Sequence, residues 1–445
     1  MKQIRLNAFA MNAVGHVSPG LWRHPRDRST EYTRLGHWLD LARTLERGLF
    51  DGIFFADVLG AYDVLGGSPA AVLRQAAQVP VGDPLLLVPA MATVTEHLGF
   101  GVTASLAYEP PFLLARRFST LDHLTGGRIA WNIVTSYLDS AARAAGRPAQ
   151  HGHDERYVLA EDSLRLMLRL WEESWEDGAV LADRAAGIYA DPARVHAIRH
   201  RGPEHSLDAI HLCEPSPQRV PVLYQAGSSP AGRGFAARHA ECVFVSGPTA
   251  AVIAPRVAAL REAVRAAGRQ PEEVLVFCLA TVVVAATDAE AHDLLAEYRS
   301  YASTEGALAL LSGWTGIDYA AVPLDSEVRF IENDAGRSAM ENFTRADPDR
   351  RWTVREVAGQ VALGGHGPVF AGSASRVADL MGDWMERTGA DGFNLAYAVM
   401  PESFEAVVGH LIPELQHRAM FKTGYASGTL RRKLFGHDTR TARNA

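Results

Sequence analysis

The chain has few cysteines and lacks the features that would place it in a membrane or an oxidising compartment. Its 445 residues include 3 cysteines, Cys213, Cys242 and Cys278, which lie far apart and form no CxxC pair. So few and so widely spaced cysteines argue against a disulfide framework or a zinc site and favour a reducing compartment. No apolar run reaches the ~18 residues that span a bilayer, and the start of the chain lacks the apolar core of a signal peptide. We therefore expect a cytoplasmic protein that has no membrane partner.

Positive charge is nowhere concentrated enough to bind a nucleic acid. The formal net charge is −7, and no block of lysine and arginine forms a basic footprint. The basic run Arg431–Lys433 is interpreted as part of a solvated C-terminal tail of about residues 420–445, because chain ends are commonly exposed. We expect no nucleic-acid partner.

Motifs for several common chemistries are also missing. There is no HExxH pattern and no pair of carboxylates suited to glycosidic acid/base chemistry. No GxGxxG follows the first predicted strand, which counts against a dinucleotide-binding unit. His151 and His153 stand two apart without an obvious third ligand, so we predict no metal site.

What the sequence does contain is a regular alternation of short apolar strands and helical segments. Such βα units predict parallel strands joined by right-handed crossovers, and eight of them predict an α/β fold of the TIM (β/α)8 barrel type. An open doubly wound sheet is the alternative. The eight predicted strands cover residues 4–12, 52–57, 98–105, 128–136, 220–227, 241–247, 273–286 and 392–397.

Two stretches break this rhythm and are predicted to be insertions in a single domain of residues 1–445. The first, about 177–219, is expected to form a hairpin. The second, about 302–370, is rich in glycine and of mixed polarity, and it is a candidate lid. The hydrophobic content of 47% is ample for one large core.

Polar residues gather at the carboxyl ends of the predicted strands, where a barrel has its active site. Together they offer hydroxyl groups, an amide, one carboxylate and an imidazole. These residues are His16, Asp57, Thr103, Ser105, Asn132, Thr135, Ser136, Ser228 and Ser229.

The segment Gln225–Ser229 suggests an anion site, because a strand ends there in Gly-Ser-Ser and a helix begins. Helix N–H groups and two hydroxyls suit a phosphate, although the same residues can simply cap the helix. Arg156 or Arg233 can add positive charge. The absence of a Walker-type lysine favours a single phosphate over a triphosphate. A flat phosphorylated cofactor such as flavin suits this set, as do other phosphorylated ligands.

The same stretches carry a resemblance to a known family. The chain resembles the bacterial-luciferase-like FMN-dependent monooxygenases, in particular the group of nitrilotriacetate monooxygenase component A, the dibenzothiophene-sulfone monooxygenases and pristinamycin synthase. The matching stretches are His16 with Trp22–Pro25, Phe50–Asp57, Leu121–Arg128, Trp131–Ser136, His153–Tyr157, Pro217–Ser229 and Gly313–Asp318.

The resemblance implies a luciferase-type TIM barrel with insertions that acts as the oxygenase component of a two-component system. FMN would arrive as FMNH2 from a separate NAD(P)H:flavin reductase, and O2 would oxygenate a small organic substrate. Carried over residue by residue, the cofactor contacts are Asp57, Thr103, Asn132, His153, Tyr157, Ser228 and Ser229.

Two further residues are candidates on the substrate side. His16 follows the first strand and is the candidate catalytic residue, with a hydrogen-bonded structural histidine as the alternative. Tyr62 is a candidate for the substrate pocket, with a plain surface tyrosine as the alternative. Relatives that carry a cysteine after the first strand differ from this chain, which reads Asn12-Ala13-Val14 there.

The sequence leaves three alternatives open. The protein can be a deazaflavin-dependent oxidoreductase of the same superfamily that transfers hydride. It can also be a member that degrades flavin or cleaves carbon–nitrogen bonds, or a non-catalytic flavin-binding barrel. We expect a homodimer or homotetramer, since symmetric oligomers are common.

Overall fold

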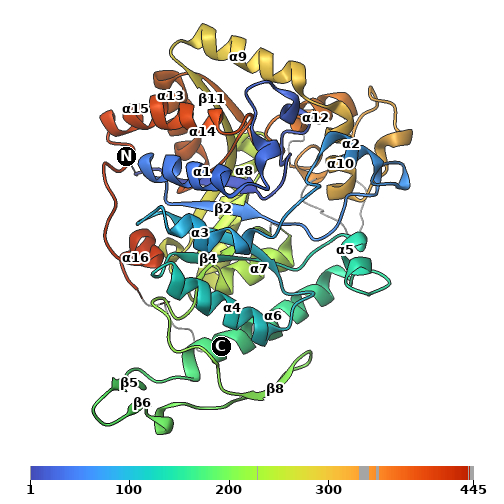
Figure 1. Cartoon of the computed structure of the whole chain (residues 1–445). Coiled ribbons are helices and arrows are strands. Elements are labelled where there is room, and N and C mark those ends of the chain that lie inside the picture. The colour runs from blue at the N-terminus through green and yellow to red at the C-terminus, as the bar shows by residue number, and fades with distance from the viewer. Residues whose placement is uncertain (1, 228, 330–339, 347–349, 439, 441–445) are drawn as a thin grey trace.

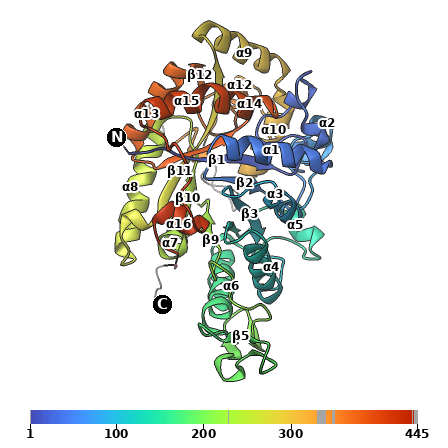
Figure 2. The same cartoon turned by 60° about the vertical axis from the view of Figure 1, so that its left-hand side comes forward.

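Eight parallel strands close into a barrel that is surrounded by helices (Figures 1 and 2). The structure is a computed structural model that describes residues 2–227, 229–329, 340–346, 350–438 and 440. Its main sheet has nine strands, and eight of them form a ring because β10 also pairs with β11. The ring runs in the order β1 (Arg5–Met11), β2 (Gly52–Ala56), β3 (Gly99–Ser105), β4 (Ile129–Val134), β9 (Val222–Gln225), β10 (Cys242–Val245), β11 (Leu275–Ala285) and β13 (Gly392–Ala396).

This ring confirms the predicted TIM barrel and excludes the open doubly wound sheet. All eight predicted strands are present, with ends that differ by a few residues. The ninth strand, β12 (Val369–Ser373), pairs with residues 281–285 of β11, beyond the part of β11 that belongs to the ring. The helices that cover the barrel are α1 (Leu35–Arg47), α3 (Val88–Ala92), α4 (Pro111–Leu124), α6 (His153–Glu173), α7 (Pro230–His239), α8 (Ala250–Ala266), α9 (Asp288–Tyr301), α13 (Ala374–Thr388), α14 (Glu402–Ala406) and α15 (Ile412–His417).

The two-residue period of the strands explains both the core and the site. On β3, Phe100 and Val102 belong to the cluster that packs against the helices, whereas Thr103 lies opposite Asn132 of β4 and lines an interior cavity. Successive side chains of a strand point to opposite faces, so each strand supplies both the outer core and the barrel interior. The barrel interior is filled largely by aromatic rings, among them Phe54 and Phe244, whose centroids lie 4.5 Å apart.

Residues 83–95 do not form one continuous helix. They form a 3-10 turn over Pro84–Leu86 followed by the short α3. The Asp83 side chain caps the turn by accepting a hydrogen bond from the Leu85 N–H at 2.8 Å. Pro89 lacks an N–H and is tolerated in the first turn of a helix, which fits the start of α3 at Val88.

The two insertions differ from each other in architecture. The first contains two hairpins where one was expected, β5 (Val180–Asp183) with β6 (Ile188–Ala190) and β7 (Ile198–Arg201) with β8 (Ser206–Ala209). They project away from the barrel (Figure 1). The second contains α10 (Thr304–Thr315) and α12 (Val354–Val361), and α10 packs against α12 and against α2 (Ala70–Gln75). The role of the second insertion as a lid stays a prediction.

Arg431, which belongs to the basic run near the C-terminus, is buried and not part of a solvated tail. This residue lies in α16 (Leu430–Phe435), and its side chain is 0% exposed. Its Nε donates to Glu241 Oε1 at 2.6 Å, and its Nη2 donates to the Val220 carbonyl at 2.9 Å. Leu430 and Leu434 of the same helix pack into the aromatic cluster inside the barrel. The expectation of a solvated Arg431 was therefore wrong, because the folded barrel offers this cation a carboxylate and several carbonyl groups.

Three buried carboxylates tie neighbouring strands together at the amino-terminal end of the barrel. Asp51, Glu241 and Asp391 come just before β2, β10 and β13. Each accepts a hydrogen bond from a backbone N–H of an adjacent strand, at 2.8, 3.0 and 2.6 Å respectively. Each is also paired with a basic side chain. These contacts fix the register of the strands and close this end of the barrel.

Glu241→Gln is expected to lower the free energy of unfolding by about 3–5 kcal/mol, because it leaves the buried Arg431 guanidinium without its charge partner. Urea denaturation measures this difference. Glu262→Gln is the control, since Glu262 pairs with Arg265 on the exposed side of α8 and such pairs contribute about 0–1 kcal/mol. Equal losses of stability in the two variants would contradict the structural role of the buried pair.

Candidate active site

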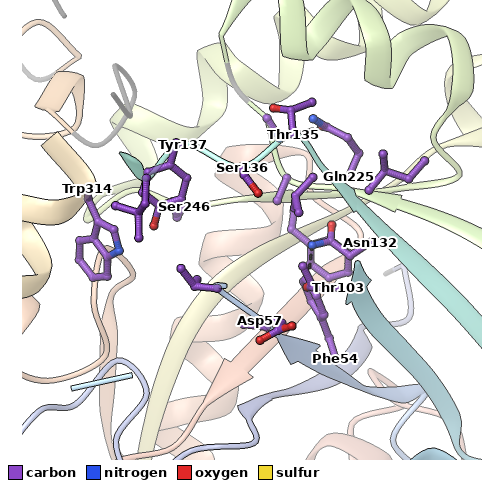
Figure 3. Close-up of a pocket in the computed structure, with 18 of the residues that line it drawn as sticks. Phe54, Asp57, Thr103, Asn132, Thr135, Ser136, Tyr137, Gln225, Ser246 and Trp314 are labelled. Atoms are coloured by element: carbon purple, nitrogen blue, oxygen red, sulfur yellow. Dashed lines mark hydrogen bonds between the residues drawn. The ribbon is translucent and has the colours of Figure 1, made fainter. Parts of the chain in front are cut away.

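A cavity of about 420 Å³ opens at the carboxyl ends of the barrel strands. This volume lies within the range of about 300–1,000 Å³ that small-molecule sites commonly have. In Figure 3, Phe54, Thr103, Asn132 and Gln225 lie on one side of the cavity, and Tyr137, Ser246 and Trp314 lie on the other. The first group comes from strands β2, β3, β4 and β9, whereas the second comes from segments that follow β4 and β10 and from α10.

Most of the residues predicted from the sequence line this one cavity. They are His16, Asp57, Tyr62, Thr103, Asn132, Thr135, Ser136, Tyr157 and Ser229. Ser228 lies outside the described residues, and His153 is the first residue of α6 but its side chain is not among those that the structure describes. Tyr62 is 3% exposed, so the alternative of a surface tyrosine was wrong.

Thr103 and Asn132 form a fixed polar pair where β3 and β4 end. Asn132 Nδ2 donates to Thr103 Oγ1 at 2.9 Å, and Thr103 Oγ1 donates to the Phe55 carbonyl at 2.9 Å. This chain of hydrogen bonds orients the amide. Asn132 Oδ1 is buried and has no hydrogen-bond partner within the described part of the chain. A buried acceptor without a partner is costly, so this oxygen suits a donor group on a bound molecule.

Asp57 follows β2 and is the only carboxylate among the described residues that line the cavity. Burial, and then the nearby charge of Asp83, raise the pKa of Asp57 to about 7. Asp57 also borders a second cavity of about 290 Å³, which Asp83 and Glu109 line as well. Near neutral pH this carboxyl group is therefore present in both protonated and ionised forms.

The start of α7 has the features of an anion site. Ser229 is the N-cap of this helix, and its Oγ accepts a hydrogen bond from the Gly232 N–H at 3.1 Å. A Cβ atom at Gly232 would lie 2.6 Å from Tyr157 Oη, so a glycine is needed there for the phenol to approach the helix. Burial raises the pKa of Tyr157, and a hydrogen bond with Ser229 opposes this shift. Arg156 lines the same cavity. A helix N-terminus, two hydroxyls and a guanidinium together favour a phosphate group.

The backbone between this anion site and β4 bends sharply. Ser136 has a φ of +57°, which is an uncommon conformation for a residue other than glycine and is often found at functional sites. Its Oγ forms a 2.8 Å hydrogen bond with Ser105 Oγ, and its carbonyl accepts a hydrogen bond from Arg156 Nη1. The predicted polar strand ends at Ser105 and Ser136 are thus in contact with each other.

The opposite wall contains a hydrogen-bond network that the sequence did not indicate. Trp314 Nε1 donates to Tyr62 Oη at 3.1 Å, and Tyr62 Oη donates to Gln78 Oε1 at 3.0 Å. Because Tyr62 has a single hydroxyl proton, Tyr137 Oη is the donor in the 2.6 Å contact between the two phenols. Gln78 Nε2 in turn donates to the His16 carbonyl at 3.1 Å. Gln78 was missed because it lies in a stretch that reads as a loop.

His16 is 3% exposed and lies against Phe9, with ring centroids 4.4 Å apart. Burial lowers the pKa of His16 to about 3, and a hydrogen bond with the Phe9 backbone opposes this shift. Its Nδ1 has no partner among the residues that the structure describes. The imidazole is therefore neutral at physiological pH, and a role as a cationic acid does not fit it.

Neither membrane-spanning helices nor metal clusters are found in the parts of the chain that the structure describes. No described helix combines the length and the apolar character that crossing a bilayer requires. No three histidine, cysteine or acidic side chains converge there as metal ligands do.

Comparison with known proteins agrees with this barrel and cavity. A family model described as luciferase-like monooxygenase matches residues 17–392, and the chain belongs to this family of monooxygenases. It is similar to the dimethyl-sulfide monooxygenase of Hyphomicrobium sulfonivorans, with 47% identity over 98% of this chain and 91% of the relative. The long-chain alkane monooxygenase of Geobacillus thermodenitrificans is 44% identical over 98% of this chain and 94% of the relative.

A solved structure gives the same result for the fold. The crystal structure of DmoA from Hyphomicrobium sulfonivorans superimposes with a TM-score of 0.92 and 46% identity, and the match covers 98% of this chain and 94% of that one. The resemblance seen in the sequence motifs is thus confirmed at the level of family and fold, and the chain is a flavin-dependent monooxygenase of the luciferase-like type.

Asp57→Asn is expected to stabilise the protein at pH 8.5 and to have little effect at pH 4.5. The folded-state pKa of Asp57, about 7, lies above the unfolded value of about 3.9. The unfolded chain therefore loses this proton first, and the contribution of Asp57 to stability is present below pH ~4 and is lost as the pH rises through ~7. The difference of about 3 between the two pKa values corresponds to a gain of up to about 4 kcal/mol for the variant at high pH.

Thermal unfolding of the wild type and the variant across this pH range tests the expectation. Asp293→Asn is the control, because Asp293 is exposed on α9. A difference between Asp57→Asn and the wild type that does not change with pH would show that Asp57 keeps an ordinary pKa.

Proposed function

We propose that the chain is the oxygenase component of a two-component monooxygenase that uses FMN as FMNH2. A separate NAD(P)H:flavin reductase supplies the reduced cofactor. One atom of O2 enters a small organic substrate, the other leaves as water, and FMNH2 provides the two electrons. The observation that carries this proposal is a single cavity that has an anion site at one end and a largely neutral, apolar wall at the other.

The residues of the anion site fit the phosphate of FMN. Tyr157 and Ser229 offer hydroxyl groups beside the start of α7, and Arg156 offers a positive charge. The proposal retains Ser228 from the family motif, although it lies outside the described residues. His153 is retained on the same ground, because its side chain is not described.

The strand ends fit the polar edge of the flavin ring. Asn132 Oδ1 is a buried acceptor, and the pyrimidine part of isoalloxazine offers both an N–H donor and carbonyl acceptors. Thr103 holds the Asn132 amide in position. Asp57, with a pKa of about 7, is proposed to bind near the same ring and to give or take a proton there.

The bound reduced flavin would supply the electrons that activate O2, and the chain would keep the reaction away from bulk water. Aromatic side chains such as Phe54, Phe235 and Phe244 line the cavity, and a dry site suppresses the loss of reactive oxygen species to solvent. His16 remains the candidate catalytic residue, as a neutral hydrogen-bonding group on the substrate or oxygen side.

We propose a small uncharged organic compound as the substrate. On the side of Tyr62, Tyr137 and Trp314, the described lining residues carry no charged side chain. The similarity to a relative named dimethyl-sulfide monooxygenase makes small organic sulfides the first compounds to test. A homodimer or homotetramer and a cytoplasmic location complete the proposal, and three free cysteines are compatible with a reducing compartment.

Mixing the protein, reduced FMN and ¹⁸O2 with dimethyl sulfide should give an oxidised product that contains one labelled oxygen atom. Mass spectrometry of the product and of the released water detects both atoms. Reduced deazaflavin in place of FMN is the control. Two results together would favour the hydride-transfer alternative. The product would contain no labelled oxygen, and deazaflavin would bind more tightly than FMN.

Tyr157→Phe is expected to weaken FMN binding by about 1–3 kcal/mol, because one hydrogen bond to a charged phosphate is lost. Riboflavin, which lacks the phosphate, provides an internal control, and its affinity should not change. Quenching of flavin fluorescence measures both affinities. Ser229→Ala should act in the same direction. An equal loss of affinity for FMN and riboflavin would contradict the proposal that the phosphate binds at this end of the cavity.

A further inference from the structure

A second histidine lines the cavity and is not used in the proposed function. His366 lies in the loop between α12 and β12, and it borders the cavity on the side of Trp314. Both of its ring nitrogens are shielded from solvent, and neither has a hydrogen-bond partner within the residues that the structure describes. Two unpaired polar atoms in a buried position are costly, so this side chain needs an explanation.

The loop that carries His366 is held firmly in place. Gly364 has a φ of +86°, and a Cβ atom there would lie 2.3 Å from Thr281 Oγ1. A Cβ atom at Gly367 would lie 2.6 Å from the Leu279 carbonyl. The Gly364 N–H donates to the Val17 carbonyl at 3.1 Å. Glycines therefore let the loop pack against β11 on one side and against the segment after β1 on the other.

The imidazole is packed between aromatic rings and is neutral. Its centroid lies 4.4 Å from that of Trp314 and 5.6 Å from that of Phe343. Burial, and then the nearby charge of Arg256, lower the pKa of His366 to about 3. A neutral imidazole has one donor and one acceptor nitrogen. A half-turn of the ring exchanges each nitrogen with a ring carbon, so a nitrogen can meet a bound molecule while the loop stays in place.

The phenol and indole groups on this side already have partners. The hydroxyls of Tyr62 and Tyr137 bond to each other, and Tyr62 also bonds to Gln78. Trp314 donates its N–H to Tyr62. Apart from Ser246, the rest of this wall includes apolar residues such as Val17, Leu138 and Leu279. A substrate in this part of the cavity therefore meets a largely apolar wall that contains the imidazole of His366, unpaired among the described residues.

We propose that His366 is a specificity-determining residue that hydrogen-bonds to a heteroatom of the substrate. The inference rests on the proposed function and narrows its substrate class to small uncharged molecules that carry an acceptor atom such as sulfur or oxygen. A pure hydrocarbon leaves the imidazole unpaired. For a polyanion, the only lysine or arginine among the described residues that line the cavity is Arg156, which belongs to the anion site.

Two molecules of similar shape test this inference, diethyl sulfide and n-pentane. The wild-type protein in complex with oxidised FMN is titrated with each, and the dissociation constants are compared. His366→Phe keeps an aromatic ring beside Trp314 but removes both nitrogens. In this variant the preference for diethyl sulfide over n-pentane should fall by about 3- to 10-fold, the range of one neutral hydrogen bond.

His366→Asn keeps hydrogen-bonding groups and should restore part of the preference, which a purely structural role of the histidine would not explain. In the wild type, an imidazole ¹⁵N resonance that is absent from His366→Phe should shift on addition of diethyl sulfide and not on addition of n-pentane. An unchanged preference in both variants, or the same ¹⁵N response to the two molecules, would overturn the inference.

These readouts separate the inference from the function on which it rests. FMN affinity is measured separately by quenching of flavin fluorescence and should be equal in the wild type and in His366→Phe. Incorporation of ¹⁸O into a product tests the monooxygenase proposal and does not depend on the sulfide-to-pentane ratio. A protein that binds FMN and discriminates the two probes through His366, but does not incorporate oxygen, would refute the proposed function and leave the specificity role supported.

Discussion

Closure of the barrel at its amino-terminal end depends on three buried carboxylates, and the rest of the structure depends on that closure. Asp51, Glu241 and Asp391 each bind a backbone N–H of a neighbouring strand and a basic side chain. Two of the cations, Lys422 and Arg431, come from the C-terminal segment. A buried carboxylate is tolerated only when it is paired and hydrogen-bonded. The C-terminal segment therefore completes the barrel, and it does so at the end opposite the cavity.

Register fixed at one end of a barrel determines which side chains meet at the other. With the strands aligned, Thr103 lies opposite Asn132, and a shift of β4 by one residue would turn Asn132 toward the helices. The two sides of the cavity differ in the chemical character of their side chains. The end of β2 supplies the carboxyl group of Asp57, and the first turn of α6 supplies the guanidinium of Arg156. The inserted α10 and the loop after α12 supply neutral and aromatic groups. A cofactor and an uncharged substrate can thus occupy one cavity in different surroundings.

Sequence reasoning succeeds here where a local pattern determines the structure. Short apolar runs that alternate with helical segments indicated the eight strands, and strand ends pointed to Asp57, Thr103 and Asn132 because barrels place their sites there. It failed where the partner is distant. Arg431 reads as a tail residue until Glu241, 190 positions earlier in the chain, provides its charge partner. Gln78 and His366 lie in loops whose positions are set by tertiary packing, and no periodicity marks them.

Several of the buried polar atoms that lack partners among the described residues lie at the cavity. His16 Nδ1, Asn132 Oδ1 and both nitrogens of His366 belong to residues that line the same cavity. The free energy cost of each such atom weighs against keeping it in a wall that only has to exclude water, where an apolar side chain of similar size would serve. A molecule that binds and satisfies these atoms recovers that cost as affinity. The unsatisfied atoms thus favour ligands whose polar groups match them, and the cavity gains selectivity at the expense of stability.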